Sequence, residues 1–118
     1  MNLPNEFIQQ TKEILAAEYD TFEAALSGAA PVSVRINTKT NYIPSDEKVP
    51  WCDTGYYLPE RPLFTADPLL HAGVYYVQEA SSMFLSQIVT KYMSDATNVL
   101  DLCAAPGGKS TLLSHYLP

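Results

Sequence analysis

The feature that most constrains the fold is a short apolar run followed by a turn sequence and a helix-forming segment. The run VLDL, Val99 to Leu102, leads into Cys-Ala-Ala-Pro-Gly-Gly, and the next residues, KSTLLSHYL, favour a helix. The sequence therefore predicts a buried strand, a tight turn and a helix in that order. Such a turn presents unpaired backbone N–H groups and the positive end of a helix dipole to an anion.

The turn resembles a phosphate-binding loop at its end but not at its beginning. A triphosphate loop that ends in Gly108, Lys109 and Ser110 needs a glycine where Cys103 stands. Asp101 suits a ligand amino group, and the free amides of the turn suit a carboxylate. The methionine end of S-adenosylmethionine therefore fits the turn better than a triphosphate does. By pattern alone, a glycine pair after a strand is as often a simple connection.

The N-terminal part of the chain changes from helical to strand periodicity. Apolar residues recur at helical spacing from Pro4 to about Glu18, and a second short helix is expected from Thr21 to Leu26. In VSVRINT, the apolar residues Val32, Val34 and Ile36 alternate with polar ones. This alternation is typical of a half-buried strand with one polar face.

The rest of the chain alternates between loops, strands and one longer helix. Residues 41–68 are rich in proline and are expected to form loops, with short strands near 49–52 and 55–58. A strand at Val74–Val77 and a helix from Glu79 to Tyr92 follow. We expect two domains, an α+β domain over residues 1–72 and a second domain over residues 73–118 that stops one helix into a larger sheet.

Composition limits the classes of function that the chain can have by itself. Seven basic and thirteen acidic residues give a net charge of −6. Because Lys and Arg supply most of the non-specific affinity for nucleic acids, the chain alone is a poor candidate for tight RNA or DNA binding. No apolar run approaches the roughly 18 residues of a membrane-spanning helix, and no signal-peptide pattern is present, so a cytoplasmic protein without membrane contact is expected. The cysteines Cys52 and Cys103 are expected to be reduced, and no metal site is expected.

Four segments, in this order, carry a resemblance to a known family. They are LPNEF (3–7), VRINTKT (34–40), VYYVQEASSM (74–83) and VLDLCAAPGGKS (99–110). The last resembles, nearly letter for letter, the cofactor motif of the Nop/Sun family of RNA 5-methylcytosine methyltransferases, and the bacterial rRNA enzymes are the most similar members. The other three are similar to the family's opening, its arginine-asparagine-threonine strand and the segment before the cofactor motif. The resemblance covers nearly the whole chain.

The resemblance implies an α+β N-terminal unit followed by the first strand and helix of a Rossmann-like α/β methyltransferase domain. It implies S-adenosylmethionine as cofactor, bound by the turn residues Cys103, Ala104, Ala105, Pro106, Gly107, Gly108 and Lys109. Lys109 would also reach toward the target cytosine. The remaining candidates on the RNA-substrate side are Arg35, Lys39, Gln78 and Ser82. For Arg35 and Lys39, ordinary solvated charges are an equally good interpretation.

The resemblance also implies a reaction for which this chain holds no nucleophile. Enzymes of this kind add a cysteine thiolate to carbon 6 of cytosine, which makes carbon 5 reactive toward the methyl donor. The family's catalytic cysteines lie downstream in Pro-Cys and Thr-Cys motifs, and this sequence contains neither motif. We therefore expect the N-terminal part of an rRNA (cytosine-5) methyltransferase that is inactive by itself. The strand Val99–Leu102 is expected to be poorly supported, or supported by self-association.

Two other classes of function stay open at this point. A P-loop phosphotransferase would use Gly107–Ser110 on phosphates and magnesium, although it would need a glycine in place of Cys103. A non-catalytic binding module would keep the N-terminal unit for protein contacts. The acidic first helix is the feature that favours such a module.

Overall fold

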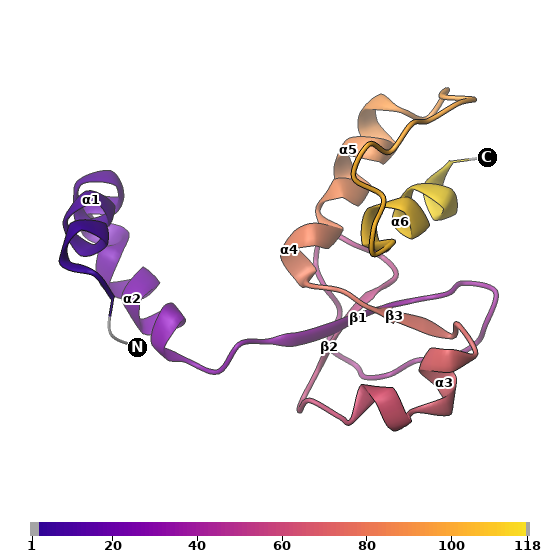
Figure 1. The fold of residues 1–118 in the computed structure, drawn as a ribbon, viewed down its shortest axis with the longest axis horizontal. Coiled ribbons are helices and arrows are strands. Elements are labelled where there is room, and N and C mark those ends of the chain that lie inside the picture. Colours follow the sequence, from indigo (N-terminus) through magenta and orange to yellow (C-terminus); the bar gives the residue numbers. More distant parts are fainter. Residues whose placement is uncertain (1–2, 118) are drawn as a thin grey trace. The chain divides into compact units, whose positions relative to one another are not determined.

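A computed structural model describes residues 3–117 of the chain (Figure 1). The chain forms two compact units, Met1–Pro31 and Val32–Pro118. None of the helices formed by residues 3–117 has both the length and the apolar character needed to span a bilayer. Cys52 is buried and Cys103 is exposed, and both carry free thiols.

The first unit is a pair of helices. Helix α1 spans Asn5–Leu15, a single 3-10 turn, η1, follows at Ala16–Glu18, and α2 spans Tyr19–Ser27. Both helices predicted from the sequence are thereby confirmed. The rings of Phe7 and Phe22 lie 6.4 Å apart between centroids, which brings the apolar sides of the two helices together.

The second unit is built on a three-stranded antiparallel sheet. Its strands are β1 (Val32–Ile36), β2 (Gly55–Leu58) and β3 (Tyr75–Val77), in the order β2-β1-β3. Val34, in the middle of β1, is opposite Tyr56 on one side and Val77 on the other. Because β1 has a neighbour on each side, it is the central strand, and Val34 is only 1% exposed.

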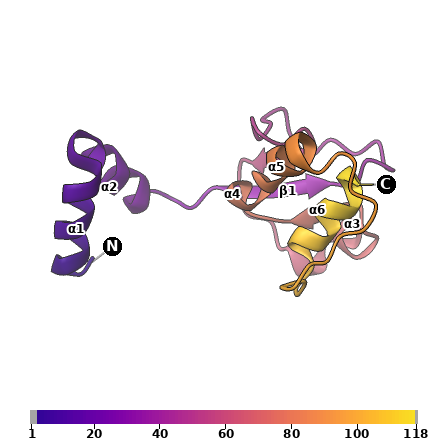
Figure 2. The same cartoon turned by 90° about the horizontal axis from the view of Figure 1, so that it is seen from above.

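Helices cover both faces of this sheet (Figure 1; Figure 2). The 3-10 turn η2 (Phe64–Ala66) and helix α3 (Pro68–His71) lie on one side, where Phe64 packs with Val34, Tyr56 and Tyr75. The other side carries α4, α5 and α6, which span Ala80–Met83, Leu85–Tyr92 and Gly108–Tyr116. The single helix predicted over residues 79–92 is therefore divided in two at Phe84.

Two details of the sheet differ from the sequence prediction. The polar residues of β1, Ser33 and Arg35, are each 5% exposed, so the polar face of this strand is buried rather than open to solvent. The reason is that Arg35 donates hydrogen bonds into α6 and Ser33 donates one to the carbonyl group of Gln78. The strand predicted near 49–52 is a turn, closed by the Cys52 amide on the Val49 carbonyl oxygen at 3.1 Å.

The segment Val99–Leu102 does not form the predicted strand. Its apolar side chains are exposed, with values of 41% for Val99, 81% for Leu100 and 86% for Leu102. Within residues 3–117 both edges of β1 are taken by β2 and β3, and the segment has no strand beside it. The α+β arrangement is thus confirmed, whereas the Rossmann-like continuation is not formed by the described residues. The predicted domain boundary between residues 72 and 73 falls inside the second unit, just before β3, and stays a prediction.

Candidate functional site

The glycine turn leads directly into α6. Gly107 precedes the helix with a φ of +111°, a conformation that residues with a side chain rarely adopt. Cys103, Ala104, Ala105 and Pro106 are exposed. The structure therefore shows the predicted turn as an accessible stretch of backbone that ends at a helix N-terminus, where amide groups have no partner within the helix.

Asp101 holds the start of this turn. Its two carboxylate oxygens accept hydrogen bonds from the Ser110 hydroxyl group at 2.7 Å and from the Cys103 amide at 2.9 Å. The bond from Ser110, followed by that from Cys103, lowers the pKa of Asp101 below its ordinary value. Asp101 is therefore ionised near neutral pH, and it joins both ends of the turn to each other.

Strand β3 and the residue after it contact the turn from the other side. The Tyr76 hydroxyl group donates to the carbonyl oxygen of Pro106 at 3.0 Å, and the Gln78 side-chain amide donates to that of Gly108 at 3.3 Å. Gln78 is 7% exposed, so its bond lies in a partly buried position. The structure thus brings the predicted residue Gln78 together with the predicted turn.

Arg35 connects this contact to the central strand. Its Nε donates to the Gln78 Oε1 at 2.9 Å, its Nη2 to the Thr111 Oγ1 at 2.5 Å, and its Nη1 to the Thr111 carbonyl oxygen at 3.4 Å. Burial lowers the pKa of the Arg35 guanidinium, but arginine starts so high that it stays charged. Arg35 is therefore a buried cation that holds β1, Gln78 and α6 together.

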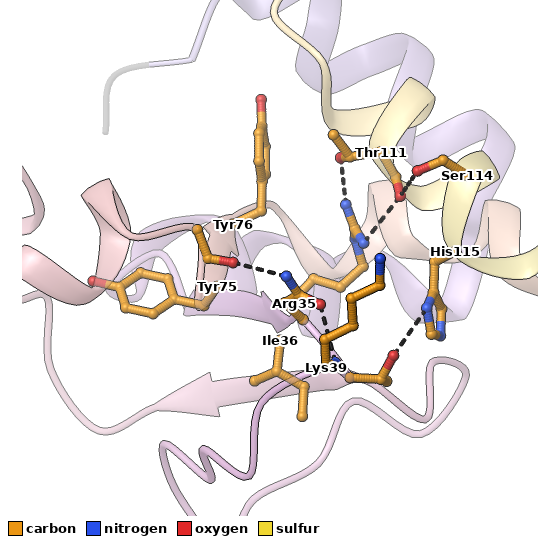
Figure 3. A pocket seen from close by; sticks show the side chains of 11 residues that line it. Arg35, Ile36, Lys39, Tyr75, Tyr76, Thr111, Ser114 and His115 are labelled. Carbon is orange, nitrogen blue, oxygen red and sulfur yellow. Dashed lines mark hydrogen bonds between the residues drawn. The ribbon is translucent and has the colours of Figure 1, made fainter.

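A hollow of about 330 Å³ opens beside Arg35 (Figure 3). We call it the Lys39 hollow, after the exposed lysine that extends into it, and it lies between the end of β1, β3 and α6. Its far wall is His115, whose Nδ1 is 3.3 Å from the Thr38 hydroxyl oxygen. The residues that line it are Arg35, Ile36, Asn37, Thr38, Lys39, Gly73, Tyr75, Tyr76, Thr111, Ser114 and His115.

The remaining candidates lie at the surface. Lys109 is exposed in the first turn of α6, and Ser82 is exposed on α4. Within residues 3–117, no hydrogen bond joins Ser82 to the turn. A second hollow, of about 320 Å³, is lined by residues that include Val99, Asp101 and Ser110 and do not include Tyr76 or Gln78.

Sequence reasoning did not single out three residues that the structure places at the site, namely Tyr76, Thr111 and His115. Thr111 and His115 are four residues apart on α6, the spacing that puts two side chains on one face of a helix. That spacing was the available signal. Tyr76 alternates with Tyr75 and Val77 along a short strand, and nothing in so short a pattern tells which side faces the turn.

Known proteins similar to this chain are rRNA methyltransferases. Residues 3–80 match the family described as the N-terminal domain of 16S rRNA methyltransferase RsmF. Curated relatives share the name ribosomal RNA small subunit methyltransferase F. The protein from Aliivibrio fischeri (strain MJ11) is 34% identical over 95% of this chain and 27% of its own length. For that from Vibrio atlanticus (strain LGP32), the identity is 32% over 98% of this chain and 28% of its length. The chain therefore spans little more than a quarter of these relatives.

Proposed function

We propose that the chain is the N-terminal part of an S-adenosylmethionine-dependent rRNA (cytosine-5) methyltransferase. The premise is that the chain belongs to the family of the N-terminal domain of 16S rRNA methyltransferase RsmF. The family match over residues 3–80 carries this proposal. It is supported by the glycine turn, which is exposed on one side and held by Tyr76 and Gln78 on the other. We also infer a cytoplasmic location, which an rRNA substrate would support.

The described residues of the turn fit the amino-acid end of S-adenosylmethionine. A carboxylate group suits the exposed amides at the start of α6, where the helix dipole also favours a negative charge. An ammonium group suits Asp101, whose oxygens each have a second lone pair beyond the bonds from Ser110 and Cys103. When bound, the cofactor supplies an electrophilic methyl group.

The side chains around the turn divide into supporting and substrate-facing groups. Gln78 and the buried Arg35 fix where the turn lies relative to the sheet, so we assign them positioning roles. Lys109 is free to extend from the first turn of α6 and is our candidate for contact with the target base. Ser82 and Lys39 are exposed and are proposed to face the RNA.

The proposal also covers the organisation of the protein. We assign residues 1–72 to an RNA-side domain and residues 73–118 to the start of a methyltransferase domain that continues in a longer protein, as in the curated relatives. The chain contains no Pro-Cys or Thr-Cys pair to supply a nucleophile. The 118-residue chain is therefore expected to transfer no methyl group to rRNA on its own.

The test is methyl transfer to rRNA by the longer protein, measured with radiolabelled S-adenosylmethionine. Lys109→Ala and Gly108→Asp should each lower the rate by about two orders of magnitude. An added Cβ at Gly108 would be in ordinary van der Waals contact with the Gln78 Nε2, at 3.5 Å. The expected loss in Gly108→Asp therefore comes from the negative charge that the aspartate brings to the proposed binding site of the cofactor's carboxylate group. Lys91→Ala, at an exposed lysine of α5, is the matched control. Wild-type rates in the Lys109 and Gly108 variants would contradict the site assignment.

A further inference from the structure

The Lys39 hollow gathers positive charge in an acidic protein. The chain has thirteen acidic and seven basic residues, yet the described residues that line the hollow include Arg35, Lys39 and His115 and no aspartate or glutamate. Like charges that face one hollow repel one another, and a bound anion removes that repulsion. The charge pattern therefore favours an anionic ligand.

The donor groups of the hollow are held in place by hydrogen bonds. The guanidinium of Arg35 has five N–H groups, and its bonds to Gln78 and Thr111 occupy three of them. On the opposite wall, Thr38 occupies the Nδ1 of His115, which leaves the Nε2 of that ring for a ligand. Lys39 extends into the space between these groups, as Figure 3 shows.

The loop that carries Lys39 is fixed at both ends. The Lys39 amide donates to the Asn37 Oδ1 at 3.1 Å, and the Asn37 side-chain amide donates to the Gly73 carbonyl oxygen at 3.1 Å. The Thr40 amide closes the turn on the Asn37 carbonyl oxygen at 3.0 Å. Because little backbone ordering is left for the moment of binding, a ligand gains more net affinity from such a loop than from a mobile one.

The size and place of the hollow point to a nucleotide within a chain. A volume of about 330 Å³ is at the lower end of ligand pockets, enough for a phosphate with its sugar. Tyr76 lines the hollow with its ring near Arg35 and also donates its hydroxyl hydrogen to Pro106 of the glycine turn. A phosphate in the hollow therefore lies beside the proposed cofactor site.

We propose that the Lys39 hollow binds a backbone phosphate of single-stranded RNA, with Lys39, His115 and the remaining N–H groups of Arg35 as its donors. This inference rests on the proposed function and specifies which part of the substrate meets the N-terminal strand. Phosphate contacts fix the register of a nucleic acid without reading its sequence. The hollow accordingly sets where the RNA chain lies relative to the turn, whatever its bases.

The test is a nuclear magnetic resonance titration of the 118-residue chain with tetracytidylate RNA at several salt concentrations. Amide resonances of residues 37–39 and the ring resonances of His115 should move together. Lys39→Gln should weaken binding about fivefold and reduce the magnitude of the slope of log affinity against log salt by about 0.7, because it removes one positive charge. His115→Ala should weaken binding about fivefold, because it removes a hydrogen-bonding group from the wall of the hollow. Lys91→Gln, on α5, should change neither quantity. Because Lys39 is exposed, its variant keeps the test valid even if the His115 variant loses its fold.

Two arms separate the possible sources of the phosphate. Inorganic phosphate and cytidine monophosphate should move the same resonances only at much higher concentrations than tetracytidylate does. Equal affinity for cytidine monophosphate and the RNA would overturn the assignment to an RNA chain, and shifts confined to residues outside the hollow would overturn the site. Methyl transfer by the longer protein is measured separately. If the longer protein transfers no methyl group while the hollow still responds to RNA, the proposed function alone is rejected. If methyl transfer occurs while the hollow does not respond to RNA, only this inference is rejected.

Discussion

Strand β1 and the segment Val99–Leu102 are both predicted as strands, but the exposure of their side chains is opposite. Both are short runs rich in valine, leucine or isoleucine with one charged residue, and both are predicted from the sequence as strands. Val34 in β1 is 1% exposed, whereas Leu102 in the segment is 86% exposed. The difference teaches that an apolar run becomes a strand only where another strand completes its hydrogen bonds.

The partners of β1 come from far along the chain. The Ile36 amide donates to the Thr54 carbonyl oxygen at 2.8 Å, and the Gln78 amide donates to that of Ser33 at 3.3 Å. Among residues 3–117, no amide of the segment 99–102 has a comparable backbone bond. In a longer protein, a further parallel strand is the partner that a Rossmann-like sheet would provide.

Hydrogen exchange should show the largest contrast between the two regions. In the 118-residue chain, the Ile36 amide should exchange about a thousandfold or more slowly than the amides of Leu100 and Leu102, because it opens only with the sheet. The measurement is amide exchange followed by nuclear magnetic resonance. Raising the protein concentration serves as a control for self-association through the exposed segment. Slow exchange at Leu100 in a dilute sample would show that the segment forms a strand without an added partner.

Shortening the same residue type in each region should give the next largest effect. Val34→Ala should lower the free energy of unfolding by about 2 kcal/mol, because it removes buried methyl groups from the sheet core. Val99→Ala should change it by less than about 0.5 kcal/mol, because its side chain is 41% exposed. Urea unfolding followed by circular dichroism measures both. Equal losses would mean that Val99 is buried in solution.

Removing one hydroxyl group should weaken the contact between the sheet and the turn. Tyr76→Phe deletes the bond to the Pro106 carbonyl oxygen and should lower the free energy of unfolding by about 0.5 kcal/mol, since this bond is exposed. Its clearer effect should be faster amide exchange at Gly107 and Gly108. Tyr92→Phe, at an exposed tyrosine of α5, is the control. An unchanged turn in the Tyr76 variant would leave Gln78 as its main support.

Changes of pH should affect the stability contributions of Tyr75, in β3, and Asp101, at the start of the glycine turn, in opposite directions. Burial, followed by the hydrogen bond to Asp67, raises the pKa of Tyr75 from 10.0 to about 12, so its contribution to stability is complete below pH 10.0 and is lost as the pH rises toward 12. The lowered pKa of Asp101 has the opposite sign, so its contribution is complete above 3.8 and is lost as the pH falls below that value. Ring resonances of Tyr75 and amide shifts of Cys103 measure the two transitions. Tyr75→Phe and Asp101→Asn should abolish the corresponding transition, and a transition that survives its variant belongs to another group.

The elements that are stable by local pattern were predictable from the sequence. Helices α1 and α2, strands β1, β2 and β3 and the turn into α6 follow from periodicity, proline and glycine. The predictions that were wrong concern features that depend on residues distant in the sequence. The split at Phe84 and the turn at 49–52 are set by packing, since Met83 from α4 joins Val49 and Cys52 in one buried cluster.

The sequence predicted several residues of the candidate site, but not the hydrogen bonds that join them. Gln78 was expected as a residue on the RNA-substrate side and the turn as the binding site of the cofactor, and the structure joins the two through the Gly108 carbonyl oxygen. Arg35 was expected on an open polar face, and its burial depends on Thr111. That partner lies 76 residues further along the chain, a separation that no local pattern encodes.

The hydrogen bonds of Arg35 also constrain the order of events when the protein folds during its synthesis. During synthesis the chain emerges from its N-terminus, and Arg35 appears long before Gln78, 43 residues later, and Thr111, 76 residues later. Until both have emerged, closing the sheet over Arg35 would bury a cation without its partners, which is costly. We therefore expect the nascent sheet to stay open until α6 has been made, so that strand β1 and helix α6 reach their final structure in a single step.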